Sequence, residues 1–457
     1  MKLFFVSLGC DKNLTDSEHI ISMMCSAGYE LTDDENEADV VIINTCCFIH
    51  DAKQESVDTI CEMARLKDNK LKALIVCGCL AERYKEEILK EICEVDAVVG
   101  SSGWDDIVNI TNSIVQNFNI DGLQTTSKVD ITRTHFKPLT YLPQYNKGRY
   151  ITTAGHYEYL KIAEGCNKHC TYCIIPKIRG PFRSVPMENL IAEAKRLAGE
   201  GVKELILVAQ ETTLYGIDLY GKKCLPELLC KLSEIDGIEW IRLMYAYPEE
   251  VTDELIEVMS TNPKICHYID IPIQHGSDNI LKRMGRLTTT KEIRQVVEKL
   301  RCKIPDICIR TTLISGFPGE KQEDFEECYR FVNEMEFDRL GIFTYSREEN
   351  TPAYEMDYQV TELLKQSRRD ELYELQQAIV FDKNENMEGK VLDAIVDGYL
   401  PEDDVYVART YKDAPDIDGF VFVYSDRELV SGDIIKVRIT DSRDYDLEGV
   451  MEDEFTE

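Results

Sequence analysis

The sequence lacks any long hydrophobic run, and it is poor in basic residues. Nothing in its 457 residues approaches the run of about 18 apolar residues that a membrane-spanning helix needs. Lys and Arg number 52 against 84 Asp and Glu, a formal net charge of −32. Long-range electrostatics therefore oppose broad contact with phosphate backbones or anionic membranes, so a nucleic-acid role needs a local basic site.

An export signal and a disulfide framework are also missing. The first residues, MKLFFVSLGCDKN, hold one Lys and an apolar run that breaks at Asp11, which is too short for a secretory signal. The 17 cysteines are odd in number and spread through a long chain. We therefore expect a cytoplasmic protein with reduced thiols, some of which bind metal.

The pattern along the first hundred residues predicts an open parallel α/β domain. Apolar runs in KLFFVSLG, ADVVIINTC, KALIVCGC and DAVVGS read as strands, and amphipathic segments between them read as helices. Such a β-α repeat favours a mostly parallel sheet that is covered on both faces. We assign residues 1–118 to this domain and residues 119–155, which lose the periodicity, to a linker.

A second β-α series predicts an incomplete parallel (β/α)6 barrel over residues 156–386. The six expected strands cover residues 159–164, 204–209, 240–245, 267–272, 308–314 and 340–344. In parallel barrels the functional residues follow the C-terminal ends of the strands, so we expect the functional site at that rim. A long polar helix over residues 361–387 closes this domain. Short alternating strands over residues 387–453 then predict a small antiparallel β-barrel.

Cys166, Cys170 and Cys173 form a CxxxCxxC array in the stretch GCNKHCTYCI, just after the first expected barrel strand. Three thiolates on one short loop can hold three irons of a 4Fe-4S cluster and leave the fourth iron open for reaction. A pure electron carrier normally supplies a fourth Cys. His169 inside the array leaves a zinc site as an alternative, and ordinary packing of the three thiols as another.

Cys10, Cys46 and Cys79 each sit at the C-terminal end of an expected parallel strand. In an open α/β sheet these strand ends meet at one crevice, so the three thiols could bind a second cluster that also has one free iron. The alternative is that they are ordinary buried cysteines of strands. Cys47 and Cys77 are competing ligands; we expect Cys47 to point away from Cys46, and Cys77 to share a strand face with Cys79 but to lie deeper.

The cysteine motifs are similar to those of a known family. CNKHCTYC resembles the signature of radical S-adenosylmethionine enzymes, and SLGCDKNLTDSE, NTCCFI and GCLAERY resemble the three Cys motifs of the methylthiotransferases. The resemblance extends over residues 2–450 and includes a C-terminal domain that looks like TRAM. Local sequences such as CIIPKIRG, AQETTLYGIDLYG and DIPIQHGSDNILKRMGR resemble the branch that modifies an aspartate of small-subunit ribosomal protein twelve.

The resemblance implies an enzyme with two 4Fe-4S clusters and S-adenosylmethionine as cofactors. It assigns Cys166, Cys170 and Cys173 to the cluster that binds S-adenosylmethionine, and Cys10, Cys46 and Cys79 to a second cluster that holds the sulfur-bearing group. The implied reaction is methylthiolation of the β-carbon of the target aspartate. Radical chemistry at the clusters agrees with the absence of a convincing Ser-His-Asp arrangement, because acid-base groups alone do not remove hydrogen from such a carbon.

Cofactor contacts are expected from the rim of the barrel. Gln210 and Glu211 follow the second barrel strand, where a Glu of the family usually meets the amino group of S-adenosylmethionine. Arg310 on the fifth strand could pair with the cofactor's carboxylate, and Gly316 in SGFPGE permits close backbone approach. The plainer interpretations are a helix cap or Lys pair for Glu211, a structural salt bridge for Arg310 and a tight strand-to-helix turn at Gly316.

The expected partners are a basic ribosomal protein, free or within the small ribosomal subunit, and a low-potential electron donor. Residues 387–457 hold 20 Asp or Glu against 7 Lys or Arg, a net charge of −13 that attracts a basic protein and repels phosphate. The same carboxylates could also be only a solubilising surface.

Two alternatives for the function stay open at this stage. One is methylthiolation of isopentenyl-adenosine in tRNA, which needs a basic path to the barrel mouth; Lys177, Arg179 and Arg183 give a short one that suits a ribosome equally well. The other is an iron-sulfur redox or sensor protein without turnover. Cleavage of S-adenosylmethionine by the reduced protein separates the enzyme from such a sensor.

Overall fold

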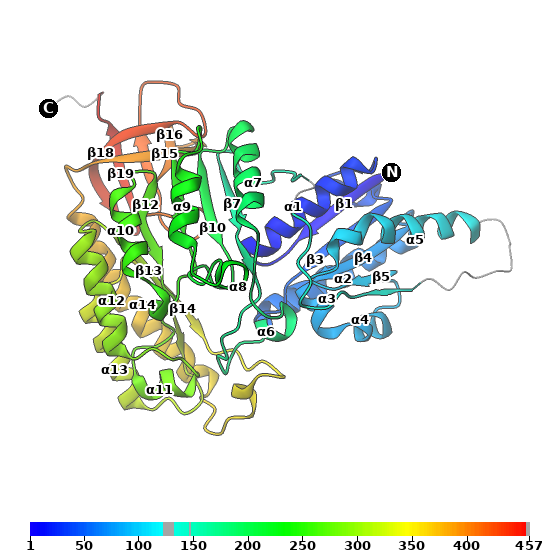
Figure 1. Ribbon diagram of the computed structural model, residues 1–457, viewed down its shortest axis with the longest axis horizontal. Helices are drawn as coiled ribbons and strands as arrows, with labels where there is room; N and C mark the ends of the chain where they lie inside the picture. Colours follow the sequence, from blue (N-terminus) through cyan, green and yellow to red (C-terminus); the bar gives the residue numbers. More distant parts are fainter. Residues whose placement is uncertain (122–131, 146–147, 454–457) are drawn as a thin grey trace.

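The computed structural model describes residues 1–121, 132–145 and 148–453. An N-terminal α/β sheet, a central parallel barrel and a C-terminal closed β-barrel follow one another along the chain (Figure 1). Among the helices in these ranges, none combines the length and the apolar character that crossing a membrane requires.

The N-terminal domain is an all-parallel sheet with strand order β2-β1-β3-β4-β5-β6. Its strands are β1 (Lys2–Ser7), β2 (Glu30–Leu31), β3 (Val40–Thr45), β4 (Ala73–Gly78), β5 (Ala97–Val99) and β6 (Thr134–His135). Its helices are α1 (Asp11–Ser26), α2 (His50–Ala64), α3 (Cys79–Tyr84), α4 (Glu86–Glu91) and α5 (Ile107–Asp121). Every residue of β3 and β4 is buried, because hydrophobic clusters cover both faces of the sheet.

Two strands of this sheet escaped the sequence analysis. β2 and β6 are only two residues long, too short to show a periodic pattern. β6 lies inside the expected linker over residues 119–155 and extends the N-terminal sheet beyond β5. That segment therefore contributes to the domain before it; residues 122–131 and 146–147 of it lie outside the described residues. The proposed domain boundaries stay a prediction.

The central domain is the expected six-stranded incomplete barrel, with strands in sequential order from β7 to β14. Its strands are β7 (Tyr157–Lys161), β10 (Glu204–Val208), β11 (Trp240–Leu243), β12 (Ile265–Asp270), β13 (Cys308–Ser315) and β14 (Arg339–Thr344), with the short pair β8 (Ala163–Glu164) and β9 (Arg183–Ser184) beside them. Its helices are α6 (Ile175–Ile178), α7 (Met187–Gly199), α8 (Ile217–Tyr220), α9 (Leu225–Ser233), α10 (Asp253–Thr261), α11 (Asp278–Arg283), α12 (Thr290–Lys303), α13 (Gln322–Met335) and α14 (Glu362–Glu385).

The C-terminal domain is a closed barrel in the order β15-β16-β17-β19-β18. The strands are β15 (Val391–Leu400), β16 (Val405–Thr410), β17 (Val421–Tyr424), β18 (Ile434–Arg443) and β19 (Asp446–Met451). All pairs are antiparallel, as predicted, except β17 and β19, which pair in parallel. Sequence alternation does not reveal this exception, because strand pairing is decided by the path of the chain and alternation is the same in both arrangements.

The C-terminal barrel packs against the ends at which the strands of the central barrel begin. Glu204, the first residue of β10, accepts hydrogen bonds from Arg242 at 2.7 Å and from Arg409 of β16 at 2.9 Å, and all three side chains are fully buried. Tyr157 at the start of β7 and Arg339 at the start of β14 also bind carboxylates of this domain. The opposite ends of the strands stay free for the functional site.

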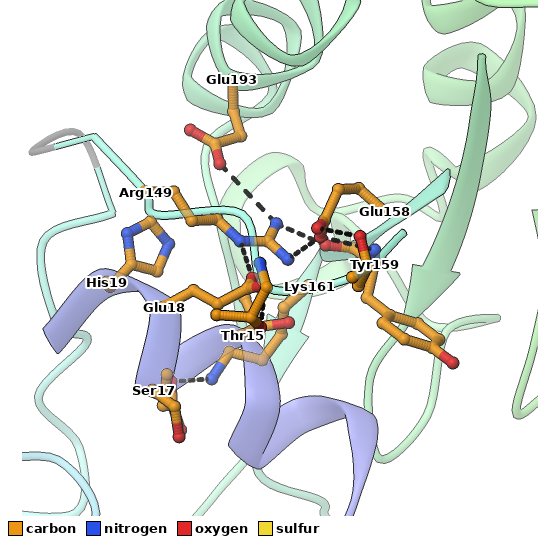
Figure 2. Close-up of polar contacts among 12 residues, drawn as sticks. Thr15, Ser17, Glu18, His19, Arg149, Glu158, Tyr159, Lys161 and Glu193 are labelled. Carbon is orange, nitrogen blue, oxygen red and sulfur yellow. Dashed lines mark hydrogen bonds and ion pairs between the residues drawn. The ribbon is translucent and has the colours of Figure 1, made fainter. Parts of the chain in front are cut away.

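Ion pairs buried between α1 and β7 join the N-terminal domain to the barrel. Arg149 reaches from the connecting segment to Glu18 of α1 at 2.6 Å, and it also pairs with Glu158 of β7 (Figure 2). Its guanidinium donates a further hydrogen bond to the carbonyl of Tyr159 at 2.6 Å. Lys161 of β7 pairs with Asp16 of α1. These contacts fix α1 beside the first strand of the barrel.

We expect the substitution Glu204→Ala to destabilise the protein by about 3–5 kcal/mol, because it leaves two buried guanidinium groups without their shared carboxylate. Urea unfolding followed by circular dichroism measures the change. The matched control is Glu257→Ala, which breaks an exposed pair with Lys303 and should leave the unfolding midpoint unchanged. Equal midpoints for the two variants would contradict the assignment.

Candidate metal centres and cofactor site

The loop that follows β7 and β8 brings Cys166, Cys170 and Cys173 together. Cys173 N–H donates to the carbonyl of Cys170 at 3.1 Å, and Lys168 N–H donates to Cys166 Sγ at 3.4 Å. Burial raises the pKa of the Cys166 thiol to about 11, and burial together with the charges of Cys170 and Cys166 raises that of Cys173. The predicted array therefore lies on one loop at the C-terminal rim of the barrel.

Glu211 is a buried carboxylate beside this loop. Its Oε1 accepts from Thr213 at 2.8 Å, whereas its Oε2 is buried without a hydrogen-bond partner, and Lys168 Nζ lies 3.9 Å from that oxygen. Burial raises the pKa of Glu211 to about 7, and the charge of Lys168 offsets part of this effect. A buried acceptor with a free oxygen suits the ammonium group of a ligand.

Gln210 and Gly316 support the rim through the backbone. Gln210 Oε1 accepts from the N–H of Gly165, the residue before Cys166, at 2.8 Å. Gly316 has a φ of +72°, and a Cβ there would lie 2.2 Å from Lys365 Cγ of α14. The glycine therefore allows α14 to pack on the turn after β13, which is a structural role.

Arg310 of β13 lies inside the barrel with two carboxylate partners. Its guanidinium is 3.0 Å from Asp270 of β12 and 3.5 Å from Asp418 of the C-terminal domain. The structural salt bridge that the sequence left open is present. Pairing of Arg310 with the carboxylate of a cofactor stays a prediction.

Cys10, Cys46 and Cys79 come from the ends of β1, β3 and β4, three adjacent strands, as predicted. Cys10 precedes α1 as its N-cap, and Cys79 is the first residue of α3. Helix N-termini favour negative charge, which suits thiolate ligands. Burial raises the pKa of Cys46 and, more strongly, that of Cys79, and the charges of neighbouring cysteines of the triad add to the rise in both.

The loops that carry Cys10 and Cys46 touch at Gly9. This glycine has a φ of +97°, and a Cβ on it would lie 2.8 Å from Cys46 Cβ and 3.0 Å from Cys46 Sγ. Only glycine combines this backbone conformation with so close an approach. The motif SLGC therefore places a glycine where two candidate ligands have to converge.

The two competing cysteines lie in the core of the N-terminal domain. Cys47 is fully buried in one hydrophobic cluster and Cys77 is 1% exposed in the other. The expectation that Cys77 and Cys79 share a strand face does not hold, because β4 ends at Gly78 and Cys79 begins a helix.

Contacts between the domains bring the Cys10 loop to the barrel rim. Tyr245, which follows β11, donates to Asp11 at 3.3 Å, and Lys12 Nζ lies 3.3 Å from the centre of the Tyr245 ring. Lys12 and Tyr245 were missed by the sequence analysis. The position of Lys12 next to GCD was a usable signal, whereas nothing in the sequence singles out Tyr245.

The expected basic path is not on the surface. Lys177 is exposed, but Arg179 is 2% exposed and Arg183 is 8% exposed. Arg179 makes ion pairs with Asp16 and Glu164, and Arg183 donates to backbone carbonyls of its own segment. These two arginines therefore do not form a track for RNA.

The donor set of each triad, three thiols, is the one that holds an iron-sulfur cluster with one open iron. Among the residues that the structure describes, no group of three His, Cys, Asp or Glu side chains is close enough to hold one metal ion. A cubane cluster takes its thiolates at separate corners, so its ligands are spread more widely than those of one ion. Each triad offers three thiols, and His169 in the barrel loop has no described contact that would make it a fourth ligand.

Curated relatives match the chain over its full length. It is 56% identical to ribosomal protein uS12 methylthiotransferase RimO of Lachnoclostridium phytofermentans, over 99% of this chain and 100% of the relative. It is 50% identical to RimO of Acetivibrio thermocellus, over 98% of each chain. The chain belongs to the RimO family of methylthiotransferases.

Family models agree with the three domains of this RimO family member. They match as Uncharacterized protein family UPF0004 at residues 2–100, Radical SAM superfamily at residues 160–332 and TRAM domain at residues 389–451. A solved structure of similar fold is the radical S-adenosylmethionine methyltransferase TsrM of Kitasatospora setae, with a TM-score of 0.55, 14% identity and coverage of 77% of this chain and 76% of that one.

We expect Gly9→Ala to destabilise the protein more than Gly28→Ala. Both glycines have a φ near the same positive value, +97° and +90°, but only Gly9 has neighbours that a Cβ would strike. Each substitution should lower the free energy of unfolding by roughly 1–2 kcal/mol, because Ala is strained at a positive φ. Gly9→Ala should lower it by at least about 1 kcal/mol more, because the new Cβ overlaps Cys46. Equal losses of stability in urea unfolding would disprove the close approach of the two loops.

Proposed function

We propose that this protein is a radical S-adenosylmethionine methylthiotransferase that modifies an aspartate of ribosomal protein uS12 at its β-carbon. The observation that carries the proposal is the 56% identity over 99% of the chain to a uS12 methylthiotransferase. Two triads of cysteines at the free ends of two parallel sheets, joined at Tyr245 and Asp11, support it.

The cofactors are two 4Fe-4S clusters and S-adenosylmethionine. When bound, they supply the radical chemistry that places a methylthio group on an unactivated carbon. We assign one cluster to the barrel thiols and the other to the N-terminal thiols, that is, to Cys166, Cys170 and Cys173 and to Cys10, Cys46 and Cys79. Three ligands for each cluster leave one iron open for a substrate or cofactor atom.

The remaining site residues act on S-adenosylmethionine and on the loop that holds its cluster. Glu211 offers its Oε2, which accepts no hydrogen bond and lies 3.9 Å from Lys168 Nζ, to the amino group of the cofactor. Gln210 holds the backbone of the cysteine loop through Gly165. Gly316 shapes the turn after β13, and its N–H donates to Glu320 Oε2 at 2.7 Å. Arg310 is assigned to the carboxylate of the cofactor, in competition with its present partners Asp270 and Asp418.

Two kinds of partner follow from this function. The substrate is uS12, either free or within the small ribosomal subunit, and the net charge of −13 over residues 387–457 favours a basic protein over tRNA. A low-potential electron donor has to reduce the clusters before each turnover. The protein acts in the cytoplasm, where this substrate is made.

The direct test is anaerobic incubation of the loaded protein with reductant, S-adenosylmethionine and either purified uS12 or tRNA. Mass analysis should find a methylthio gain on one aspartate of uS12 and no gain on tRNA. Gain on tRNA alone would reverse the choice of substrate, and the absence of deoxyadenosine would indicate a sensor without turnover.

The ligand assignment predicts additive iron contents. Replacement of Cys10, Cys46 and Cys79 by Ala should remove half of the iron of the reconstituted protein and abolish methylthiolation, while S-adenosylmethionine is still cleaved. Replacement of Cys166, Cys170 and Cys173 should remove the other half and stop the cleavage. Replacement of Cys47 and Cys77 is the control, and loss of iron in that variant would transfer the ligand role to these residues.

The role of Glu211 predicts a pH dependence of cofactor binding. Its pKa of about 7 means that the carboxylate, which binds an ammonium group, is lost as the pH falls below that value. Affinity for S-adenosylhomocysteine, measured by equilibrium dialysis, should therefore fall by up to about tenfold per pH unit below pH 7. Glu211→Gln should bind weakly at all pH values. A wild-type affinity that is the same on both sides of pH 7 would refute this role.

A further inference from the structure

Arg179 reaches from the central barrel into the N-terminal domain. It directly follows α6, which begins two residues after Cys173, and α6 lies against α3 of the N-terminal domain. Its side chain is among the largest that are fully buried in the described residues. The segment that holds the barrel's cysteines therefore continues into a charged side chain at the second cysteine triad.

The guanidinium of Arg179 contacts a thiol of that triad. Its Nε donates to Cys79 Sγ at 3.3 Å, and its Nη2 donates to Asn13 Oδ1. Asn13 is itself fixed, because its amide donates to the carbonyls of Leu8 and Thr45 at 3.0 Å each. Leu8 lies just before Cys10, and Thr45 is the last residue of β3 before Cys46. Cys79 Sγ donates to Asn13 Oδ1 at 3.7 Å, so Asn13 links the Arg179 side chain to all three cysteine segments.

Carboxylates on both sides of the domain boundary hold the guanidinium in place. Nη1 donates to Asp16 of α1 at 2.8 Å and to Glu164 of β8 at 3.0 Å. Lys161 pairs with the same two carboxylates, so that two cations and two anions are balanced in a buried group. These two carboxylates fix the orientation of the planar guanidinium through Nη1. In this orientation its Nε–H points at the sulfur of Cys79.

We propose that Arg179 is a positioning residue for the second cluster, which fixes the sulfur of Cys79 and raises the reduction potential of the cluster that this sulfur holds. The inference rests on the assignment of Cys10, Cys46 and Cys79 as ligands. A hydrogen bond to a ligating sulfur and a buried positive charge both stabilise the more negative, reduced state of a cluster. The barrel domain thus tunes a metal centre of its neighbour.

The test uses full-length protein in which Cys166, Cys170 and Cys173 are replaced by Ala, so that only the second cluster remains. Arg179→Gln removes the charge and the outer part of the guanidinium, and its shorter side chain carries only a neutral amide at the position of Nε. The matched control is Arg149→Gln, since Arg149 is also a buried arginine between the domains but pairs with Glu18 and Glu158 and contacts no thiol. Midpoint potentials are measured by anaerobic redox titration followed by electron paramagnetic resonance.

Arg179→Gln should make one-electron reduction at least tenfold less favourable, a fall of about 59 mV in midpoint potential. Arg149→Gln should leave the potential unchanged, because Lys161 and Arg179 still pair with Asp16 of α1 and hold the two domains together in that variant. An unchanged potential in Arg179→Gln, or an equal fall in the control, overturns the proposal. The absence of a cluster in the Cys166, Cys170 and Cys173 variant with Arg179 intact would instead refute the ligand assignment.

A second variant, Arg179→Lys, tests the proposal if Arg179→Gln fails to bind a cluster. Arg179→Lys keeps a cation for Asp16 and Glu164 but lacks the planar fork that reaches the sulfur. The Arg179→Lys protein should bind the cluster and have a lower midpoint potential than the parent protein. A potential equal to that of the parent overturns the proposal. If neither variant binds a cluster, but both unfold at the same denaturant midpoint as the cluster-free Arg149→Gln protein, the positioning of Cys79 by Arg179 is supported. If both fail to fold, Arg179 is a structural residue and the proposal fails.

Discussion

The buried ion pairs between α1 and β7 are the contact on which the arrangement of the functional site depends. Asp16 and Glu18 of α1 pair with Lys161 and Arg149, and all four side chains are buried. A buried charge costs several kcal/mol unless its partner is in place, so a displaced or rotated N-terminal domain would leave charges unpaired. The pairs thereby select one orientation of two domains, and that orientation brings the loop of Cys10 to the rim of the barrel.

The parts of the fold that repeat along the chain could be predicted from the sequence. Strands buried on both faces are continuous apolar runs, and β3 and β4 show such runs clearly. The convergence of Cys10, Cys46 and Cys79 followed from the rule that the carboxyl ends of parallel strands share an edge. The pattern placed Cys79 at the end of a strand, although this residue begins a helix.

Features that depend on contacts between domains could not be predicted. Arg179 lies in a loop rich in cations, and a charged loop is solvent-exposed in most proteins. It is buried here because its guanidinium donates to Asp16 of the other domain, 163 residues away, and to Glu164 of its own domain. The same limit applies to β6, whose two residues pair with β5 from inside an irregular segment, and to Tyr245, which approaches Asp11 only when the domains are docked. The hydrophobic periodicity of a segment indicates which of its residues are buried, but it does not indicate which other segments they contact.

The position of the acidic C-terminal barrel restricts how it can act on a substrate. Its contacts with Glu204, Tyr157 and Arg339 hold it at the ends where the barrel strands begin, whereas the cysteine loops follow the ends where they finish. Electrostatic attraction through solvent is screened within about 8 Å at physiological ionic strength, which is short compared with the length of a barrel. The acidic surface therefore acts little on a side chain in the site itself. Steering by these carboxylates, as proposed above, therefore requires a macromolecular substrate whose basic parts extend along the outside of the enzyme.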